Sequence, residues 1–240
     1  MAQLFLYSVI LFIVSAAVWW LYHWLFIITE GVFLGPRLVV WLYDREAYRY
    51  DDIKMYDMED ELILLVEPIL GELSGAKEPI LLDVAVGTGR VPLFLFKDGR
   101  FTKDLNGRVV GVDASQAMLD LADKNLSEVA GRCELLLGSA DAINFADRSF
   151  DAVSCLESLE FFPNPEKAIE EMIRVLKPGG SLLITRRAGW ESRWFLGRHY
   201  DQKEFVALLE KKGLTDAVLY QWQNNYDLVI GRKPNVDEVV

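Results

Sequence analysis

The residues with the clearest chemical potential lie between Ile80 and Phe96, in the sequence I-L-L-D-V-A-V-G-T-G-R-V-P-L-F-L-F. An apolar run of strand type ends at Asp83, a loop of small residues contains Gly87 and Gly89, and a run that can form a helix follows. Glycine has no Cβ, so such a loop can turn sharply and bring its backbone close to a ligand. The first N–H groups of the helix have no partner inside the helix. The segment therefore predicts the opening unit of a nucleotide-binding α/β sheet.

Two common phosphate-binding motifs do not account for this loop. Counted from Gly87 it reads G-x-G-x-x-P, with Pro92 where the dinucleotide fingerprint has a third small residue. The chain contains no G-x-x-x-x-G-K-[ST] sequence, which excludes a P-loop. From these residues alone, a turn in some other α/β protein remains an alternative interpretation.

A second acid follows the next predicted strand. The segment from Arg108 to Val112 predicts a strand that ends at Asp113. A carboxylate at this point can accept hydrogen bonds from both hydroxyl groups of a ribose. Ser115 is a candidate N-cap of the helix that comes next. An acid on the surface without a ligand is the alternative.

The motifs, taken in order, resemble those of class I S-adenosylmethionine-dependent methyltransferases. The pattern D-x-A-x-G-x-G from Asp83 is similar to the family's first motif, usually D/E-x-G-x-G-x-G, with Ala85 in place of the first glycine. The sequence G-V-D-A-S-Q-A-M-L resembles the second motif. The run P-E-K-A-I-E-E-M-I-R-V-L-K-P-G-G-S-L-L-I resembles the segment after the family's fourth strand. The resemblance covers about residues 61–233 and is nearest to the small-molecule branch that includes quinone and sterol methyltransferases.

This resemblance implies a fold, a cofactor and a set of binding residues. The fold is α/β, a Rossmann-like, seven-stranded and mostly parallel sheet with helices on both faces. The cofactor is S-adenosylmethionine, and we expect no metal. By the resemblance, Asp141 and the backbone of Ala140 and Ala142 contact the adenine, whose exocyclic amine needs an acceptor. Ser139 stands where the family often has Asp. The predicted cofactor-binding residues are Asp83, Ala85, Val86, Gly87, Gly89, Asp113, Ala114, Met118, Ala140, Asp141, Ala142 and Cys155.

Composition limits the other functions. The net charge is −11, so no basic stripe is available to neutralise phosphates, and a nucleic acid is not expected as a partner. The two cysteines, Cys133 and Cys155, form no C-x-x-C and lie in apolar runs. We expect buried free thiols there and no structural metal site.

The N-terminal segment predicts a membrane anchor. Residues 4–28 contain no Asp, Glu, Lys or Arg, and as a helix of about 1.5 Å per residue they exceed the roughly 30 Å hydrocarbon thickness. Trp19, Trp20 and Trp24 cluster near the end of this run, as in an interfacial aromatic belt. A cleavable signal peptide is the alternative, but no basic residue precedes the run. Arginines follow the run, which predicts a single-pass protein with its domain in the cytoplasm.

The chain is thereby divided into four parts. We predict a transmembrane anchor in residues 1–30, an interfacial and cofactor-covering entry segment in 31–60, the methyltransferase domain in 61–233 and a tail in 234–240. Residues 44–57 are rich in tyrosine and resemble the segment that covers the cofactor in many methyltransferases. A solvated linker is the alternative there. The aromatic segment 188–200 could line an apolar acceptor pocket or pack on the membrane-proximal side.

Methyl transfer is a displacement at a sulfonium carbon, for which the protein must orient cofactor and nucleophile. A hydroxyl acceptor would also need a base. Glu157 and Glu160 follow the fourth predicted strand, and His199 lies in the aromatic segment. Each is a candidate base, and none is certain, because each could equally contact only solvent or substrate.

The leading hypothesis is S-adenosylmethionine-dependent methyl transfer to a small or lipid-like acceptor at the membrane surface. A non-catalytic membrane adaptor that keeps the fold is an alternative of another class. A nicotinamide-dependent oxidoreductase is a third, which Pro92 and the downstream motifs disfavour. The sequence leaves open the acceptor molecule, its acceptor atom and the oligomeric state.

Overall fold

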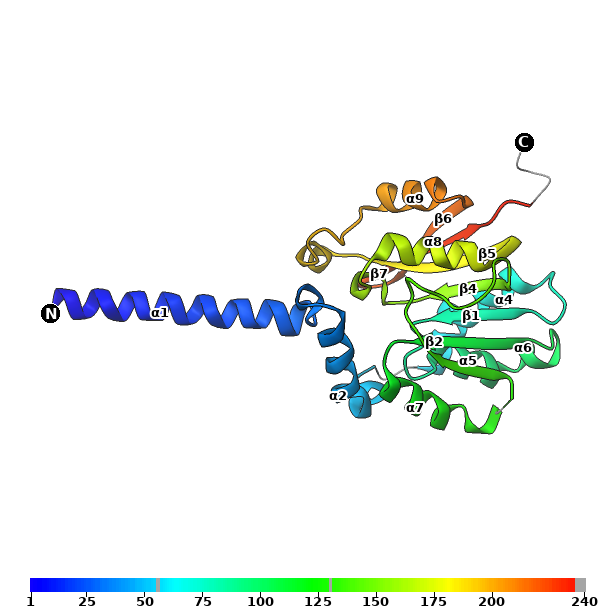
Figure 1. Cartoon of the computed structure of the whole chain (residues 1–240), viewed down its shortest axis with the longest axis horizontal. Coiled ribbons are helices and arrows are strands. Elements are labelled where there is room, and N and C mark those ends of the chain that lie inside the picture. The colour runs from blue at the N-terminus through cyan, green and yellow to red at the C-terminus, as the bar shows by residue number, and fades with distance from the viewer. Residues whose placement is uncertain (55–56, 130, 236–240) are drawn as a thin grey trace.

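A long N-terminal helix projects from an α/β domain in the computed structural model, which describes residues 1–54, 57–129 and 131–235 (Figure 1). The domain contains one seven-stranded sheet in the order β3-β2-β1-β4-β5-β7-β6. Strands β1 to β5 pair in parallel, and β7 pairs antiparallel with both β5 and β6. The predicted fold class is confirmed. The strands are β1 (Ile80–Val84), β2 (Arg108–Asp113), β3 (Cys133–Leu137), β4 (Phe150–Cys155), β5 (Leu176–Arg187), β6 (Thr215–Gln223) and β7 (Tyr226–Arg232).

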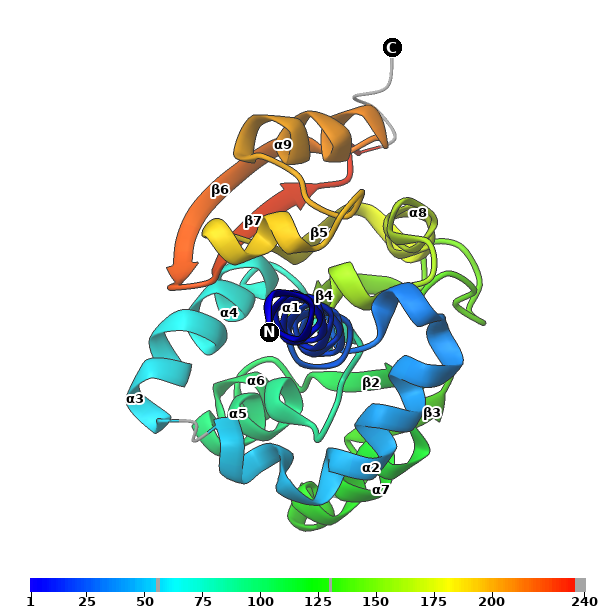
Figure 2. The same cartoon turned by 90° about the vertical axis from the view of Figure 1, so that its left-hand side faces the viewer.

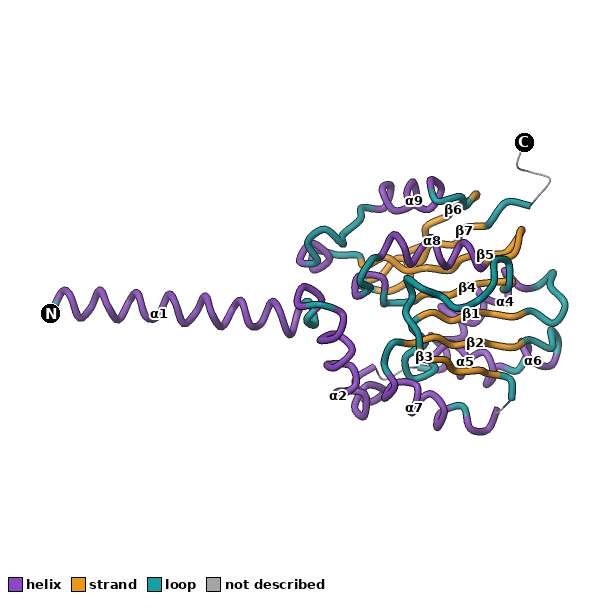
Figure 3. The backbone as a smooth tube through the Cα atoms, in the orientation of Figure 1, coloured by secondary structure: helices purple, strands orange, loops and turns teal. Residues whose placement is uncertain are grey.

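Helices precede the sheet, connect its strands and cover both of its faces (Figure 3). The α-helices are α1 (Ala2–His23), α2 (Pro36–Lys54), α3 (Met58–Glu61), α4 (Glu67–Leu73), α5 (Arg90–Asp98), α6 (Arg100–Lys103), α7 (Gln116–Asn125), α8 (Pro165–Val175) and α9 (Gln202–Lys211). Short π and 3₁₀ segments are η1 (Trp24–Ile28), η2 (Val32–Leu34), η3 (Leu62–Val66), η4 (Ser127–Val129), η5 (Leu159–Phe161) and η6 (Trp190–Trp194).

The two layers of the core follow from the alternation of side chains along each strand. Leu82 of β1 belongs to the cluster that packs under α8 and α9, whereas its neighbour Leu81 belongs to the cluster under η3, α4 and α5. Both leucines are fully buried. A parallel sheet covered on both faces must have such near-continuous apolar strands. The amphipathic helix α8 supplies Ile169 and Met172, each with no exposed surface, to the first cluster.

The loop after β1 adopts glycine-like backbone angles at three positions. Gly87 and Gly89 have φ values of 54° and 87°, and Ala85 has a φ of 60°. An L-residue in this left-handed region costs roughly 1–2 kcal/mol. Ala85 nevertheless adopts this left-handed conformation, at the position where the family motif has its first glycine.

Two predicted boundaries are corrected. The sequence K-P-G-G at 177–180 predicts a turn before the fifth strand, but β5 already begins at Leu176. Gly179 N donates to Lys233 O and Lys233 N donates to Gly180 O, both over 2.8 Å, so the antiparallel ladder continues through the glycines. The apolar periodicity of residues 61–73 predicts a helix that begins at Glu61. The helical run starts earlier, at Met58, because Asp57 caps it by accepting from the N–H groups of Glu59 and Asp60.

Within the described ranges of the chain, one helical run, Ala2–Ile28, is long and apolar enough to span a membrane. Its C-terminal end contacts the domain. The ring of Trp20 lies 5.7 Å from that of Trp194, and Trp24 Nε1 donates to the carbonyl oxygen of Trp194 over 3.3 Å. Trp24 also stacks on Phe33 at 5.1 Å. Of the two interpretations of segment 188–200, the structure therefore favours packing beside the anchor.

The predicted boundaries between the four parts remain predictions. The tail predicted from Pro234 lies mostly outside the described residues, which end at Asn235.

We expect Gly111→Ala in β2 to destabilise the domain. An added Cβ would lie 2.9 Å from the side chains of both Leu135 and Val86, closer than packed carbon atoms allow. Overpacking of this kind costs about 1–3 kcal/mol. Gly75→Ala is the matched control, because its Cβ would meet nothing within 4 Å. Denaturant unfolding of the detergent-solubilised chain measures both, and equal stability of the two variants would contradict the packing argument.

Candidate functional site

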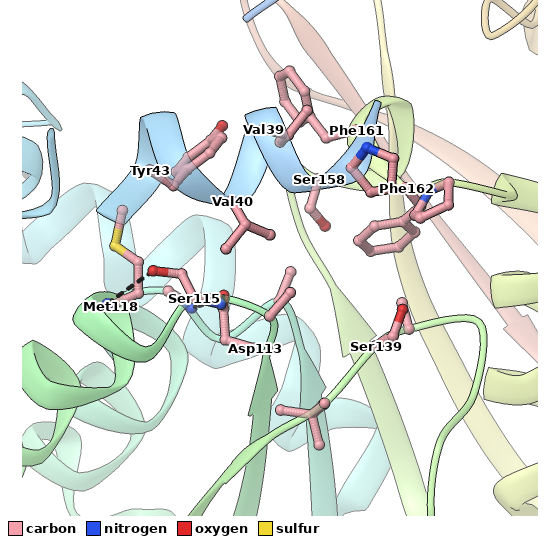
Figure 4. Close-up of a pocket in the computed structure, with 18 of the residues that line it drawn as sticks. Val39, Val40, Tyr43, Asp113, Ser115, Met118, Ser139, Ser158, Phe161 and Phe162 are labelled. Carbon is pink, nitrogen blue, oxygen red and sulfur yellow. Dashed lines mark hydrogen bonds between the residues drawn. The ribbon is translucent and has the colours of Figure 1, made fainter. Parts of the chain in front are cut away.

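A pocket lies at the carboxyl edge of the sheet, where β1, β2 and β3 end beneath α2 (Figure 4). Ligands of open α/β sheets bind at this edge. We call it the sheet-edge pocket. It is lined by Pro36, Val39, Val40, Tyr43, Tyr50, Ala85, Gly87, Val112, Asp113, Ala114, Ser115, Met118, Gly138, Ser139, Ala140, Leu156, Glu157, Ser158, Phe161, Phe162 and Pro163.

Asp113 holds the glycine loop against the end of β2. Its Oδ2 accepts a hydrogen bond from Gly87 N and its Oδ1 accepts one from Ser115 N, each over 2.9 Å. Burial raises the pKa of Asp113, and these N–H donors oppose that rise. Each carboxylate oxygen keeps acceptor capacity beyond the one bond shown, because an ionised carboxylate has about four lone-pair sites.

Asp83 lies beneath the loop and does not line the pocket. Its carboxyl group is 2% exposed and accepts a hydrogen bond from Ser154 Oγ over 2.7 Å. Burial raises the pKa of Asp83 to about 7, which the hydrogen bond from Ser154 only partly offsets. The side chain of Asp83 therefore contacts the interior of the domain and does not reach a ligand in the pocket.

Helix α2 forms the outer wall of the sheet-edge pocket and is held to the domain at its middle and at its end. In its middle, Asp44 Oδ1 accepts from Ser115 Oγ over 2.5 Å and from Ala117 N over 3.3 Å. At its end, Lys54 Nζ lies 2.6 Å from Glu157 Oε2. In Figure 4 the side chain of Val40 comes from α2 and points towards Asp113. The entry segment predicted to cover the cofactor thus begins over this pocket.

A second, larger cavity adjoins the first, with a volume of about 1120 Å³ against about 160 Å³. We call it the helix-end cavity, because Phe26 and Ile27 at the end of the N-terminal helical run form part of its wall. The two spaces share Tyr43, Tyr50, Glu157 and Phe161. The remaining lining residues of the helix-end cavity are Glu30, Leu42, Glu46, Lys54, Asp57, Asp60, Glu61, Leu64, Arg90, Arg187, Trp222, Gln223, Asn224, Asn225 and Tyr226.

A network of four charged side chains lies along the boundary between the two cavities. Arg90 contacts both oxygens of Glu61, over 2.8 Å and 2.6 Å, and its Nη1 lies 2.6 Å from Glu157 Oε1. Lys54 contacts the other oxygen of Glu157. Burial alone would raise the pKa of Glu157, but Lys54 and Arg90 together bring that pKa below its usual value. The carboxylate is therefore ionised at neutral pH.

Sequence reasoning missed most of this network. It included Glu157 but not Arg90, Glu61 or Lys54. Two signals were available: Arg90 directly follows the glycine loop, and Glu61 is an acid within an apolar helical run. Neither signal identifies its partner, because the residues are 29 positions apart in the chain.

The structure brings six of the twelve predicted cofactor-binding residues to the pocket wall. The residues that line it are Ala85, Gly87, Asp113, Ala114, Met118 and Ala140. The residues that do not line it are Asp83, Val86, Gly89, Asp141, Ala142 and Cys155. Asp141 lies next to the wall and accepts a hydrogen bond from Ser139 Oγ over 2.5 Å. Cys155 lies in the core with no exposed surface, and Leu156, the next residue, lines the wall.

The expected free thiols are present, although only one is fully enclosed. Cys155 is buried and Cys133 is half-buried. Burial raises the pKa of both thiols to about 12.

The three candidate bases fall in different surroundings. Glu157 lines both cavities. Glu160 is 3% exposed, lies 3.0 Å from Arg187 Nε and accepts from Tyr226 Oη over 2.7 Å, so its carboxylate is engaged inside the domain. His199 is exposed and lines neither cavity. The segment that carries His199 packs, through Trp194, against the C-terminal end of the N-terminal helical run.

Comparison with known proteins identifies the family. Residues 82–184 match the family model described as a methyltransferase domain. The demethylmenaquinone methyltransferase of Lactobacillus johnsonii is 34% identical over 65% of this chain and 70% of its own length. The chain belongs to the class I S-adenosylmethionine-dependent methyltransferases.

The alignments cover 40% to 70% of the length of the demethylmenaquinone methyltransferases that the chain resembles. Among solved structures, the [4+2]-cyclase SpnF aligns with a TM-score of 0.65 and 20% identity, over 84% of this chain and 97% of that one. A SAM-dependent methyltransferase from Aquifex aeolicus aligns with a TM-score of 0.56 and 21% identity, over 74% and 98%. At these identities the structures show the shared fold alone.

S-adenosylmethionine is the cofactor of this family, and the sheet-edge pocket fits it chemically. A Cβ built on Gly87 meets nothing within 4 Å, so the loop leaves open space on the pocket side. Asp113 offers a carboxylate to hydroxyl groups, and Val112, Met118 and Leu156 offer apolar surface to a flat base. Among the described residues, no cluster of metal-ligating side chains is found.

The raised pKa of Asp83 predicts that the stability of the domain depends on pH. A carboxyl group has a pKa of about 3.9 when unfolded, whereas burial raises the pKa of Asp83 to about 7 in the folded chain. Between these values only the folded chain holds the proton, so stability falls as pH rises from about 4 to about 7, by a few kcal/mol. We expect Asp83→Asn, which has no proton to lose, to remove this part of the slope. Unfolding midpoints across this pH window measure it, and parallel curves for both proteins would refute the assignment.

Proposed function

We propose that the chain transfers the methyl group of S-adenosylmethionine to a small, apolar-tailed acceptor, and that α1 anchors it as a single-pass membrane protein with its domain in the cytoplasm. One observation carries the proposal. The helix-end cavity joins the sheet-edge pocket at four shared residues and reaches Phe26 and Ile27, at the end of the apolar helix. An acceptor dissolved in a bilayer would enter at that end and present its reactive part at the shared wall.

The relatives support a quinone-type acceptor. Several relatives with similar sequences are named demethylmenaquinone methyltransferases and ubiquinone/menaquinone biosynthesis C-methyltransferases. A quinol is a flat ring with hydroxyl groups and an apolar tail. The helix-end cavity offers rings at Tyr43, Phe161 and Trp222 and charged groups at Arg187 and Glu157. The wall of this cavity combines aromatic and apolar side chains, which suit a ring and its tail, with charged and amide side chains that can contact hydroxyl groups.

The cofactor supplies an electrophilic methyl group when it is bound. The chain's own contribution is orientation and charge. Glu157 stays ionised beside Lys54 and Arg90, so it can accept a hydrogen bond from an acceptor hydroxyl. Its lowered pKa makes it a weak base, so we assign it positioning rather than proton removal. Tyr50, whose pKa burial raises, stays protonated on the same wall and can donate.

Binding and transfer assays on the purified full chain test this function. We expect S-adenosylhomocysteine to bind and NAD not to bind. With cofactor carrying a labelled methyl group, we expect the label to appear in the lipid fraction of a membrane extract. Binding of NAD alone would overturn the cofactor assignment. Cofactor binding without transfer to any extract would instead indicate a non-catalytic adaptor.

Asp113→Ala tests the proposed contact with the ribose. We expect the dissociation constant for S-adenosylhomocysteine to rise at least tenfold, which is about 1.4 kcal/mol. Asp120→Ala is the control, because it removes the same charge from α7, where Asp120 accepts only from Gln116 on the exposed side. Asp113→Asn keeps an acceptor for Gly87 N and separates loss of ligand contact from loss of loop order. Unchanged affinity in Asp113→Ala would refute the ribose role.

A further inference from the structure

Helix α2 has an exposed face that the sheet-edge pocket does not explain. Four residues at spacings of four, four and three fall on one side of the helix, opposite the side that carries Val39 and Tyr43. We call them the α2 stripe. Its members are Arg37, Trp41, Arg45 and Tyr48. Trp41 is 51% exposed and Tyr48 is 73% exposed, which is high for aromatic side chains in a folded domain.

The α2 stripe lies at the end of the proposed anchor. Helix α2 runs across the domain face from which α1 projects, as the view along α1 shows (Figure 2). The contacts of Trp20 and Trp24 with Trp194 and Phe33 fix that arrangement. The apolar residues 4–28 would extend about 37 Å as a helix, beyond the roughly 30 Å of hydrocarbon. The last turns of the run, and α2 with them, therefore reach the level of the lipid headgroups.

The chemistry of the α2 stripe suits an anionic lipid surface. Arginine, tryptophan and tyrosine are the side chains that favour the membrane interface. The guanidinium of Arg45 lies 5.6 Å from the centre of the Trp41 ring, so the cation and the ring could contact the same lipid headgroup region. Two acids lie nearby: Asp44 is hydrogen-bonded to Ser115 of the domain, and Glu46 forms an exposed 3.7 Å pair with Arg45, which is a weak interaction at such a distance in solvent.

Apolar residues from other segments extend this surface around the end of α1. Leu34 is 48% exposed, and Trp190 and Leu196 of the segment that packs on the anchor are 67% and 63% exposed. The ring of Trp190 lies 6.1 Å from that of Trp194, which itself contacts the anchor. Continuity with α1 selects a bilayer over a protein as the occupant of this surface.

We propose that the α2 stripe docks on the anionic headgroups of the bilayer that holds α1, so that α2 contacts lipid on one face and covers the sheet-edge pocket with the other. The inference rests on the proposed anchoring of α1, but not on methyl transfer. Each basic residue near an anionic surface contributes about 1 kcal/mol, or roughly fivefold in the docking equilibrium. Losing Arg37 and Arg45 should therefore weaken docking more than tenfold.

The test uses the full chain in nanodiscs that hold one chain each, with an environment-sensitive fluorophore on an added cysteine. Tyr48→Cys reports docking, Val14→Cys in the middle of α1 reports anchoring, and Tyr220→Cys on β6 reports the domain surface. Cys133 and Cys155 react slowly, because burial raises the pKa of each thiol to about 12, and the parent chain gives the background. Nitroxide lipids serve as quenchers at the headgroup and acyl-chain levels.

With phosphatidylserine present, we expect headgroup-level quenching at position 48, acyl-chain quenching at 14 and none at 220. Arg37→Gln combined with Arg45→Gln should abolish the signal at 48 and preserve that at 14. Lys203→Gln combined with Lys211→Gln, an equal charge loss on exposed positions of α9, should change neither. If the arginine variant does not fold, the test uses added salt on the chain with both arginines in place. Salt should then screen their charges and abolish the quenching at position 48.

Quenching at 14 without quenching at 48 would overturn the docking and leave the anchor. The absence of quenching at both positions would overturn both. Quenching at 48 that persists in phosphatidylcholine alone, or that withstands salt, would overturn the anionic contact. None of these outcomes bears on cofactor binding, which the S-adenosylhomocysteine titration measures separately.

Discussion

The ion pairs of Arg90 are the interaction on which the site depends. This guanidinium starts the helix after the glycine loop and contacts Glu61 from the preceding helical run and Glu157 from the end of β4. Through Glu157 it is joined to Lys54 on α2. The Arg90 and Glu157 side chains are each only 11% exposed. Loss of either one would therefore leave the charge of the other without its partner in a poorly solvated environment. The network therefore links the three segments that enclose both cavities: the loop, the sheet edge and the covering helix.

The sequence predicted the architecture well because local patterns carry it. Apolar runs closed by an acid placed β1 and β2 correctly, and both acids, Asp83 and Asp113, lie at the expected strand ends. Residues 218–222 and 226–230, on either side of Asn224-Asn225, predict a closing strand pair, and β6 and β7 pair there. The K-P-G-G turn was wrong because a bond between Gly179 and Lys233, from a distant strand, decides the local conformation. The residues near position 178 in the sequence do not indicate this contact with Lys233.

The site was predicted only in part, and the physical reason differs between residues. Alternation within β4 decides that Cys155 faces the core while Leu156 faces the pocket, and a shift of one residue reverses this. His199 suggested chemistry by its type, but the contact of its segment with the anchor places it elsewhere. The pairing of Arg90 with Glu61 and Glu157 depends on tertiary packing alone. Spacing identifies the residues of a motif and not the side chains that surround them.

The connection between α1 and α2 has a consequence for how the covered pocket can open. Only three residues lie between Gly31 and Gly35, and both glycines have positive φ values, 75° and 105°. A Cβ on Gly35 would meet nothing within 4 Å, so the backbone is unobstructed there. Helix α2 would therefore swing about a pivot at the foot of the anchor. If α1 spans a bilayer as proposed, movement of α2 off the pocket and tilting of α1 would share one degree of freedom, and a stiffer bilayer would slow the release of a product.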